Sequence, residues 1–433
     1  MASPYYLPPG DKRARGAGSI FWLLILAALA LCPSVLAEPG SLDPTFDGDG
    51  RVTTDLGSPN EDAVGVAVQP DGKIIVVGVN PGAVGGDVVL ARYTTSGMLD
   101  ATFDGDGIRA FAGLRPADVA VQTDGKIVVA GSANSADFDD DLALARFNAD
   151  GTFDTSFGNG GIAADDGSFN GNDKGHGIGL QADGKIVVVG WTDQGSEGGD
   201  GVIGRFNGDG TPDTSFGGGD GRAVLSLGPH FSASAVAIQP NGKIVVGGVV
   251  GWQFGLVRLQ SGGPLDDSFS GDGKVRTDLG ANGRARDVAV QSDGKIVVAG
   301  SAAGDFALAR YTRRGRLDAT FSHDGKKRTD FNGGYDEARG VVLESNGRIV
   351  VAGSSAPPGH AFDANFGLAR YRASGELDLT FSRNGKQRTR FGSNHQDHAN
   401  DVALQADGRI VVAGRITTVI DAYDLGLARY LAQ

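Results

Sequence analysis

The chain has 433 residues, of which 71 are glycine and 40% are hydrophobic, and its formal net charge at pH 7 is −13. Such an acidic balance argues against nucleic acid and anionic membranes as partners. The glycines recur at fixed places beside Asp, Asn and Ser, which indicates many tight turns and argues against a low-complexity, disordered chain.

The N-terminus has the pattern of a secretory signal peptide. The basic stretch "KRAR" precedes an apolar run over residues 19–31, and small side chains around Ala37 offer a cleavage site. The apolar run is shorter than the ~20 residues that a membrane-spanning helix needs, so an uncleaved anchor is the weaker alternative. We therefore predict a signal peptide over residues 1–37 and an exported protein over residues 38–433, which is secreted, periplasmic or held at the cell surface. Cys32 is the only cysteine, so the mature chain has no disulfide.

One hairpin sequence is written seven times. It first occurs as "VAVQPDGKIIVVG" over residues 66–78, and its copies begin at Val119, Ile178, Val236, Val288, Val341 and Val402. The first strand of the hairpin alternates, whereas the second is apolar on both faces and should be buried on both. The Asp-Gly or Asn-Gly pair between them predicts a two-residue type I′ turn.

A third strand with a fixed arginine follows each hairpin. The arginines, which stand in "LARY" and its variants, are Arg92, Arg146, Arg205, Arg258, Arg310, Arg370 and Arg429. Each shares a face with a buried Leu or Ile, where an unpaired charge would cost several kcal/mol. We expect an acidic or carbonyl group to hold each arginine, with the aspartates of the "G-x-x-D" turns as candidates. Seven equivalent copies favour a structural role.

A short fourth strand such as "KVRTDL" (residues 274–279) completes each unit. Four-stranded units of 52–61 residues, repeated seven times, predict an all-β fold, a seven-bladed β-propeller of four-stranded blades. Residues 42–56 contain a fourth strand with no partners before it, and the chain closes on three strands without a fourth. We therefore expect the N-terminal strand to complete the last blade and close the ring.

The pattern "LDxTF…DG…TD(F/L)G…DVAVQxDGKIVVAG…LARY" resembles the delta-60 repeat family of bacterial propellers, and the likeness extends from Leu42 to the C-terminus. The unit also resembles NHL-type repeats, although their "N-x-R" third strand is absent. The resemblance implies a propeller and supplies no activity, catalytic residue or ligand.

Positions that differ between copies are the candidates for binding. In most propellers the first strand is innermost, so its entry opens onto one mouth of the central channel. Five places before the Gln or Glu that ends each first strand stand Val64, Ala117, His176, Ser234, Arg286, Arg339 and Asn400. Seven places before it stand Asp62, Arg115, Lys174, Ser232, Arg284, Glu337 and His398. The densest polar patch is "NHQDHAND", and the predicted ligand-binding residues are His176, Arg286, Arg339, His395, His398, Asn400 and Asp401.

Metal and aromatic candidates are weaker. The spacing of His395 and His398 suits a helix better than a loop, so no metal site is predicted there. Turns such as "FDGDG" resemble the start of a calcium loop, but they lack a distal Glu. In later copies of the repeat some of the aspartates are replaced by other residues. Calcium is therefore the one cofactor left open, and turn chemistry explains these residues without it. Trp191 and Trp252 follow second strands, and they either stack on a ligand or pack at the strand ends.

These observations favour an exported, monomeric propeller that binds a protein or glycan through one channel mouth and its variable loops. The insertions between second and third strands should crowd the same mouth as the entries of the first strands. The alternative is a secreted polysaccharide hydrolase or lyase with paired carboxylates at that mouth. No catalytic residue is assigned, because the sequence contains no nucleophile elbow, phosphate-binding loop or Ser-His-Asp order.

Overall fold

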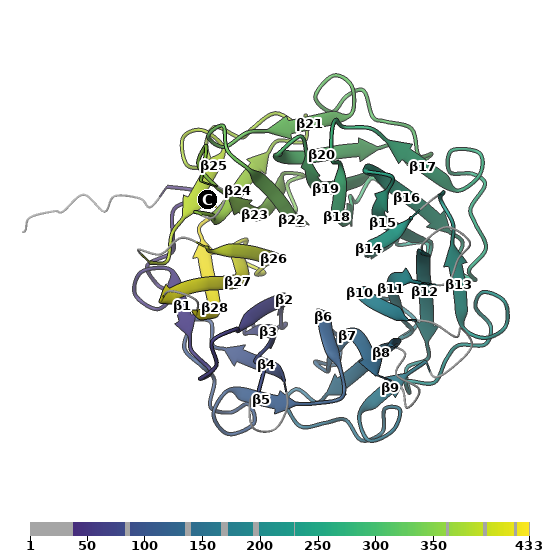
Figure 1. The fold of residues 1–433 in the computed structure, drawn as a ribbon, viewed down its shortest axis with the longest axis horizontal. Coiled ribbons are helices and arrows are strands. Elements are labelled where there is room, and N and C mark those ends of the chain that lie inside the picture. Colours follow the sequence, from purple (N-terminus) through teal and green to yellow (C-terminus); the bar gives the residue numbers. More distant parts are fainter. Residues whose placement is uncertain are drawn as a thin grey trace, which may run out of the picture. The chain divides into compact units, whose positions relative to one another are not determined.

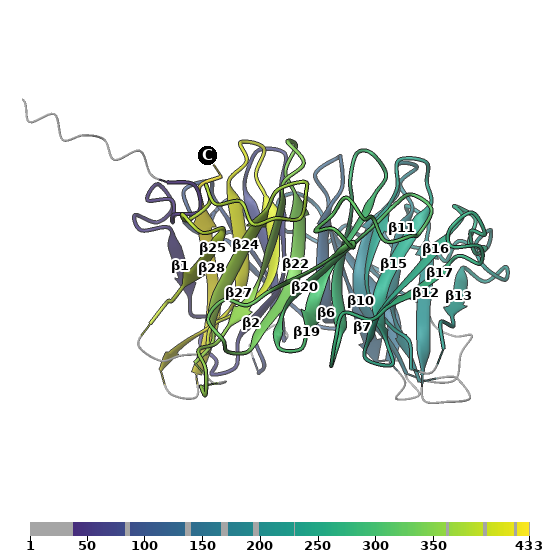
Figure 2. The same ribbon diagram turned by 90° about the horizontal axis from the view of Figure 1, so that it is seen from above.

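A computed structural model describes residues 38–82, 87–134, 140–165, 172–193, 199–228, 230–360, 363–392, 396–419 and 422–432. In these segments all regular elements are β-strands, which form seven four-stranded antiparallel sheets around a central axis (Figure 1). The strands run between the two faces of the ring (Figure 2). The predicted seven-bladed propeller is confirmed. The predicted signal peptide lies outside the described residues, among which no helix is long and apolar enough to cross a membrane.

Each blade is an up-and-down sheet whose first strand lies innermost (Figure 1). The innermost strands of blades 1–7 are β2 (Asp62–Val68), β6 (Arg115–Val121), β10 (Asp173–Leu180), β14 (Ser232–Ile238), β18 (Arg284–Val290), β22 (Asp336–Leu343) and β26 (His398–Leu404). The second strands are β3 (Ile74–Val79), β7 (Ile127–Asn134), β11 (Ile186–Thr192), β15 (Ile244–Val250), β19 (Ile296–Ala302), β23 (Ile349–Ser355) and β27 (Ile410–Val419). The third strands are β4 (Val88–Tyr93), β8 (Asp140–Phe147), β12 (Asp200–Phe206), β16 (Gln253–Leu259), β20 (Asp305–Tyr311), β24 (Asn365–Tyr371) and β28 (Ala422–Tyr430). The outermost strands are β5 (Ile108–Phe111), β9 (Ile162–Ala164), β13 (Arg222–Leu225), β17 (Lys274–Thr277), β21 (Lys326–Thr329), β25 (Lys386–Thr389) and, in blade 7, β1 (Arg51–Thr54).

The ring closes as the two ends of the repeat array predict. Strand β1 pairs antiparallel with β28, from Arg51 opposite Ala428 to Thr54 opposite Leu425. The N-terminal strand therefore completes blade 7, and the outer edge of β28 is covered.

The hydrophobic core lies between blades. The described residues form seven buried clusters, each drawn from two neighbouring blades. The second and third strands supply most of the fully buried side chains, such as Ile127 and Val129 on one strand and Leu144 on the next. A strand that is packed on both faces must be apolar at successive positions, which explains the "KIVVAG" sequence.

A set of ion pairs, repeated in every blade, holds the arginine that recurs in each third strand. Each arginine lies 2.6–3.0 Å from the predicted turn aspartate, which also binds the Lys or Arg at the hairpin end at 2.7–3.3 Å. Each guanidinium also lies 4.3–4.8 Å from the centroid of a Phe ring. It donates to a main-chain carbonyl of the next blade, as Arg258 does to Arg313 O at 2.6 Å. The expectation that a buried acid and a carbonyl hold each arginine is confirmed, and the carbonyl ties each blade to its neighbour.

The turn inside each hairpin differs from the prediction. In blade 1 Gln69 N donates to Lys73 O, so the loop has three residues, Pro70, Asp71 and Gly72. Only Gly72 has a positive φ, at 84°. A type I′ turn needs a positive φ at both central residues, so that prediction was wrong. The geometry is a tight turn followed by a left-handed glycine, the second common hairpin connection.

Every innermost strand contains a β-bulge near its entry. The pairing with the second strand shifts by one residue at the same place in all seven blades. The shift presses a carbonyl of the inner strand onto the last Gly of the "VVAG" sequence. A Cβ on Gly300 would lie 1.9 Å from Arg284 O, and one on Gly353 would lie 2.0 Å from Glu337 O. The repeated glycine is therefore a steric requirement of the bulge.

We expect Gly300→Ala to destabilise the propeller by roughly 1–3 kcal/mol, because the strand must move away from Arg284 O. Urea denaturation of residues 38–433 measures this cost. Gly218→Ala is the control, since its Cβ would meet nothing within 4 Å. Equal midpoints for the two variants would contradict the steric account.

Candidate functional site

The bulges place one residue of each blade at a single mouth of the channel. The unpaired residues at the seven register shifts are Val64, Ala117, His176, Ser234, Arg286, Arg339 and Asn400. They are the ring predicted by counting back from the ends of the first strands. A bulge redirects its extra side chain, and here all seven side chains line one cavity of about 580 Å³. The cavity wall is completed by Asp62, Pro116, Ser232, Val249, Trp252 and Arg284.

The connections between second and third strands reach the same mouth. The end of β3 pairs with the start of β2, with Val79 opposite Asp62, so the β3–β4 connection leaves from the entry of the inner strand. Blade 5 repeats this register, with Ser301 opposite Arg284. The described ends of these connections therefore lie at the face where the inner strands begin, as predicted, and residues 83–86, 135–139, 194–198 and 361–362 of the insertions lie outside the described residues.

A chain of polar contacts crosses four blades at the mouth. Arg286 donates to Glu337 Oε1 from Nε at 3.0 Å and from Nη2 at 2.6 Å, and Arg339 Nη2 binds Glu337 Oε2 at 3.2 Å. Arg339 Nη1 donates to Asn400 Oδ1 at 2.7 Å, and Asn400 Nδ2 donates to Asp62 Oδ1 at 2.6 Å. Burial would raise the pKa of Glu337, but the two arginines outweigh it and lower that pKa. The arginine side chains keep about a third of their surface, at 35% and 33%, so both can also contact a ligand.

An exposed tryptophan flanks these arginines. Trp252 follows β15, is 54% exposed and lines the cavity. The guanidinium of Arg284 lies 4.9 Å from its ring centroid. Of the two alternatives for this residue, full packing at a strand end is wrong, because more than half of its surface is exposed at the mouth, and stacking on a ligand stays a prediction. Trp191 is half-buried, with Lys174 Nζ 5.9 Å from its ring centroid.

Both histidines of the described mouth are neutral at physiological pH. Burial lowers the pKa of His176, whose Nδ1 donates to Ala233 O at 2.9 Å. Burial, with the charges of two arginines, lowers the pKa of His398 to about 4, and its Nδ1 lies 3.0 Å from Ser354 Oγ. The cavity wall therefore carries three arginines and one titrating acid. Burial raises the pKa of that acid, Asp62, to about 6, although Arg415 and Arg339 lower it.

Asp401 lies on the channel wall and holds two main-chain N–H groups. Its Oδ2 accepts from Val66 N of the next blade at 2.8 Å, and its Oδ1 accepts from Val402 N at 2.7 Å. Asp118 and Asp287 make the same pair of contacts across two other blade boundaries. Burial raises the pKa of all three carboxyls, and their mutual repulsion contributes to that of Asp401. These aspartates join adjacent blades.

The predicted binding residues thus divide into three groups. His176, Arg286, Arg339 and Asn400 line the cavity. His398 is the first residue of β26, two residues before Asn400, and does not line the cavity. Asp401 follows Asn400 on the same strand. His395 lies outside the described residues. Sequence reasoning did not find the bulge that builds the ring, although an invariant glycine inside each second strand was a signal for it.

Comparisons with known proteins agree with this architecture. A family described as "Domain of unknown function (DUF5122) beta-propeller" matches residues 69–103, 122–157, 181–216, 239–269, 291–321, 344–381 and 405–433. No curated protein matches the chain.

Solved structures of other proteins are similar to this chain at low identity. A catalytically inactive virginiamycin B lyase from Staphylococcus aureus with quinupristin is 11% identical, with a TM-score of 0.50, over 87% of this chain and 98% of its own. U3-55K is 11% identical, with a TM-score of 0.51, over 88% of this chain and 98% of its own. An ulvan lyase, described as a new polysaccharide lyase family, PL25, is 10% identical, with a TM-score of 0.44, over 87% of this chain and 96% of its own. The likeness to the first two structures shows the fold alone. The family match covers a segment in each of the seven repeats and confirms the resemblance, so the chain belongs to the beta-propeller family described as a domain of unknown function (DUF5122).

Proposed function

We propose that the protein is an exported binding module whose mouth cavity takes an acidic saccharide. The observation that carries this proposal is the charge of the cavity wall, which has three arginines and one aspartate in a chain of net charge −13. A cationic recess in an otherwise acidic protein attracts an anion to that recess and repels it elsewhere.

The chemistry of the wall favours a saccharide over a simple anion. Guanidinium groups bind carboxylates and sulfates through two parallel hydrogen bonds, which Arg286 and Arg339 can offer while Glu337 fixes their orientation. Trp252 is 54% exposed, and its ring, which also contacts Arg284, suits the apolar face of a sugar ring. A cavity of about 580 Å³ suits a short stretch of a uronate- or sulfate-bearing chain.

Calorimetric titration of residues 38–433 with a sulfated disaccharide tests the proposal. We expect Arg339→Gln to weaken binding about 10-fold or more, because it removes a charge-assisted contact. The neutral parent disaccharide should bind far more weakly, and Arg383→Gln, whose side chain is 82% exposed in a turn away from the cavity, should leave affinity unchanged. Equal affinity for the sulfated and neutral sugars would contradict the proposal.

The pH dependence of this binding has a definite sign. Asp62 loses its negative charge as the pH falls through about 6, so the cavity becomes more positive. A sulfate stays ionised over this range. Affinity for the sulfated disaccharide should therefore rise between pH 7 and pH 5, and Asp62→Asn should abolish that rise.

A polysaccharide lyase or hydrolase acting at the same mouth is the second candidate function. Asp62 is the observation that favours it, because a carboxyl with a pKa of about 6 can exchange a proton near neutral pH. The wall offers no second acid among its described residues, and Asn400 Nδ2 donates to both Asp62 Oδ1 and Ala63 O. Release of unsaturated uronate or new reducing ends that is lost in Asp62→Asn would favour the enzyme over the binding module.

A further inference from the structure

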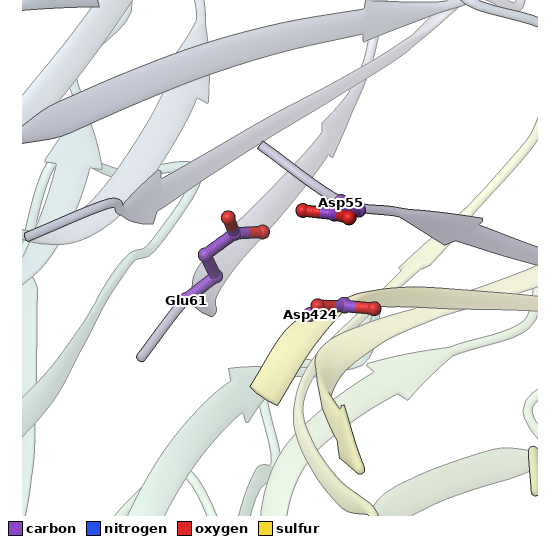
Figure 3. Close-up of side chains that lie close together, drawn as sticks. All are labelled: Asp55, Glu61 and Asp424. Carbon is purple, nitrogen blue, oxygen red and sulfur yellow. The ribbon is translucent and has the colours of Figure 1, made fainter. Parts of the chain in front are cut away.

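Three acidic side chains converge at each of two boundaries between blades. Asp305, Asp330 and Asp336 meet between blades 5 and 6, and Asp55, Glu61 and Asp424 meet between blades 7 and 1 (Figure 3). Within each group, one carboxylate oxygen from every residue lies within 4.8 Å of the others. We call these groups the 5/6 cluster and the 7/1 cluster. Both lie outside the mouth cavity.

The two clusters occupy the same places in the repeat. One acid lies in the third strand of a blade, three residues before the Leu of "LARY", and one directly follows the outermost strand of that blade. The last stands at the entry of the innermost strand of the next blade. Each cluster therefore spans a blade boundary, and the 7/1 cluster lies where β1 closes the ring.

A third boundary has the same acids with a cation already between them. Asp141, Asp165 and Asp173 stand at the corresponding places between blades 2 and 3, and Arg222, the first residue of β13, extends into this group. Its guanidinium is fully buried, contacts Asp165 and binds Asp173 Oδ2 at 3.1 Å. Burial lowers the pKa of Arg222 to about 10, while Asp141 raises it, so the side chain remains charged at pH 7. This boundary shows that the arrangement of acids accommodates a positive charge.

Among the described residues, no basic side chain forms an ion pair with Asp330 or Asp336 of the 5/6 cluster. The residue that corresponds to Arg222 is Lys386, whose Nζ binds the main-chain oxygen of Asp330 at 2.9 Å and that of Phe331 at 3.4 Å. Within the described chain, the one ion pair to this cluster is the 3.9 Å contact between Arg328 and Asp305 at its edge.

The innermost acid of the 5/6 cluster has an oxygen without a partner. Asp336 is fully buried, and its Oδ2 accepts from Phe331 N at 2.8 Å. No described main-chain N–H or basic side chain donates to its Oδ1, and the Ser355 hydroxyl beside the carboxyl lowers its pKa. Burial outweighs these contacts and raises the pKa of Asp336, with repulsion from Asp330 and Asp305 adding to it. A buried carboxylate without a counter-charge is costly, and a bound cation removes that cost.

Among the residues that the structure describes, the 7/1 cluster likewise has no basic partner. The residue that corresponds to Arg222 there is Ile108, and none of the three acids forms an ion pair with a described side chain. Glu61 is fully buried and accepts main-chain N–H groups of Leu56 at 2.8 Å and Ser58 at 2.9 Å, which fixes its carboxyl toward the other two acids.

We propose that the 5/6 and 7/1 clusters each bind one divalent cation, with Ca²⁺ preferred, and that these cations join neighbouring blades. Carboxylate oxygens are the ligands that hard cations take, and Ca²⁺ tolerates irregular coordination better than Mg²⁺. The proposal is independent of the ligand of the mouth. It also differs from calcium at the Asp-Gly turns, where carboxylates such as Asp49 and Asp106 accept the main-chain N–H two residues ahead.

Calorimetric titration of chelator-treated residues 38–433 with CaCl₂ tests the proposal. The expected stoichiometry is two ions per chain, with dissociation constants in the range of about 10⁻⁵–10⁻³ M. Asp336→Asn and Glu61→Gln should each lose one ion and retain the other, because each substitution removes one carboxylate from one cluster. Asp324→Asn, which removes the same charge from an exposed turn of blade 5, should retain both ions.

Thermal unfolding gives a second measurement that does not depend on the variants. Saturating Ca²⁺ should raise the melting temperature of the unmodified protein by about 3 °C or more, and Mg²⁺ should raise it less. Asp336→Asn keeps an oxygen for Phe331 N, so circular dichroism should show an intact fold. A folded protein that takes up no Ca²⁺, or a stoichiometry of two that survives both cluster variants, would overturn the proposal.

Discussion

A chain that lacks residues 38–57 should fail to form a stable propeller. The deletion removes β1, and the free edge of β28 is then open to pair with other molecules. It also removes Asp43, which binds Arg429 at 2.9 Å and Arg409 at 2.7 Å, and it leaves the buried Arg429 without its acid. Loss of one partner of a buried ion pair alone costs about 3–5 kcal/mol, and the lost strand pairing adds to it.

Size-exclusion chromatography and thermal unfolding compare residues 58–433 with residues 38–433. We expect the shorter chain to aggregate or to lose its cooperative transition. A synthetic peptide of residues 38–57 added during refolding should restore a monodisperse protein with the original transition. A short chain that stays monodisperse and melts at the same temperature would show that β1 is dispensable.

Asp266→Asn should destabilise the propeller by about 3–5 kcal/mol at pH 7. Asp266 is almost fully buried and binds both Arg258 and Lys243 at 2.7 Å. The neutral amide leaves the buried guanidinium of Arg258 without a counter-charge. The shift of the urea midpoint measures this loss, and Glu376→Gln, which removes an exposed partner of Lys327, should leave the midpoint unchanged.

The pH dependence of this loss checks its electrostatic origin. Burial alone would raise the pKa of Asp266, but hydrogen bonds from Lys243 and Ser268 and the charge of Arg258 lower it to about 2. A lowered pKa stabilises the folded state above the ordinary value near 4 and loses this effect as the pH falls toward 2. The difference between Asp266→Asn and the unmodified protein should therefore shrink between pH 4 and pH 2. A difference that is constant with pH would assign the loss to packing.

The repeat made the fold predictable from sequence. Seven copies of one unit identify the strands by their agreement, and an unpaired fourth strand at one end fits a missing one at the other. The pairing of Arg258 with Asp266, and of its six equivalents, follows from the cost of burying a charge. Such constraints are the same in every blade and so appear in the sequence as repetition.

The local geometry of the turns and of individual side chains was harder to predict from the sequence. The Asp-Gly pair of the hairpin fits either a two-residue or a three-residue loop, and pairing of Gln69 with Lys73 selects the longer one. The exposed indole of Trp252 could not be told from a packed one, because its environment comes from the neighbouring blade. The acidic clusters each join residues of two blades, far apart in the sequence, so their convergence became visible only in three dimensions.

The seven residues at the mouth were predictable from the sequence, but the β-bulge that places them there was not. Counting back from the end of each inner strand found all seven residues because the bulge falls at the same offset in every copy. The partners of those residues were not predictable, since Arg286 and Arg339 share Glu337 across a blade boundary. The charges and hydrogen bonds at the mouth therefore depend on contacts between side chains of neighbouring blades, at positions where the repeats differ in sequence.

A crystal structure of residues 38–433 soaked with the sulfated disaccharide tests the binding account most directly. The account predicts ordered density in the mouth cavity, with a sulfate or carboxylate within hydrogen-bond distance of Arg286 or Arg339 and a sugar ring against Trp252. A saccharide ordered at the opposite face or on the rim of the disc, with only solvent in the mouth cavity, would contradict it.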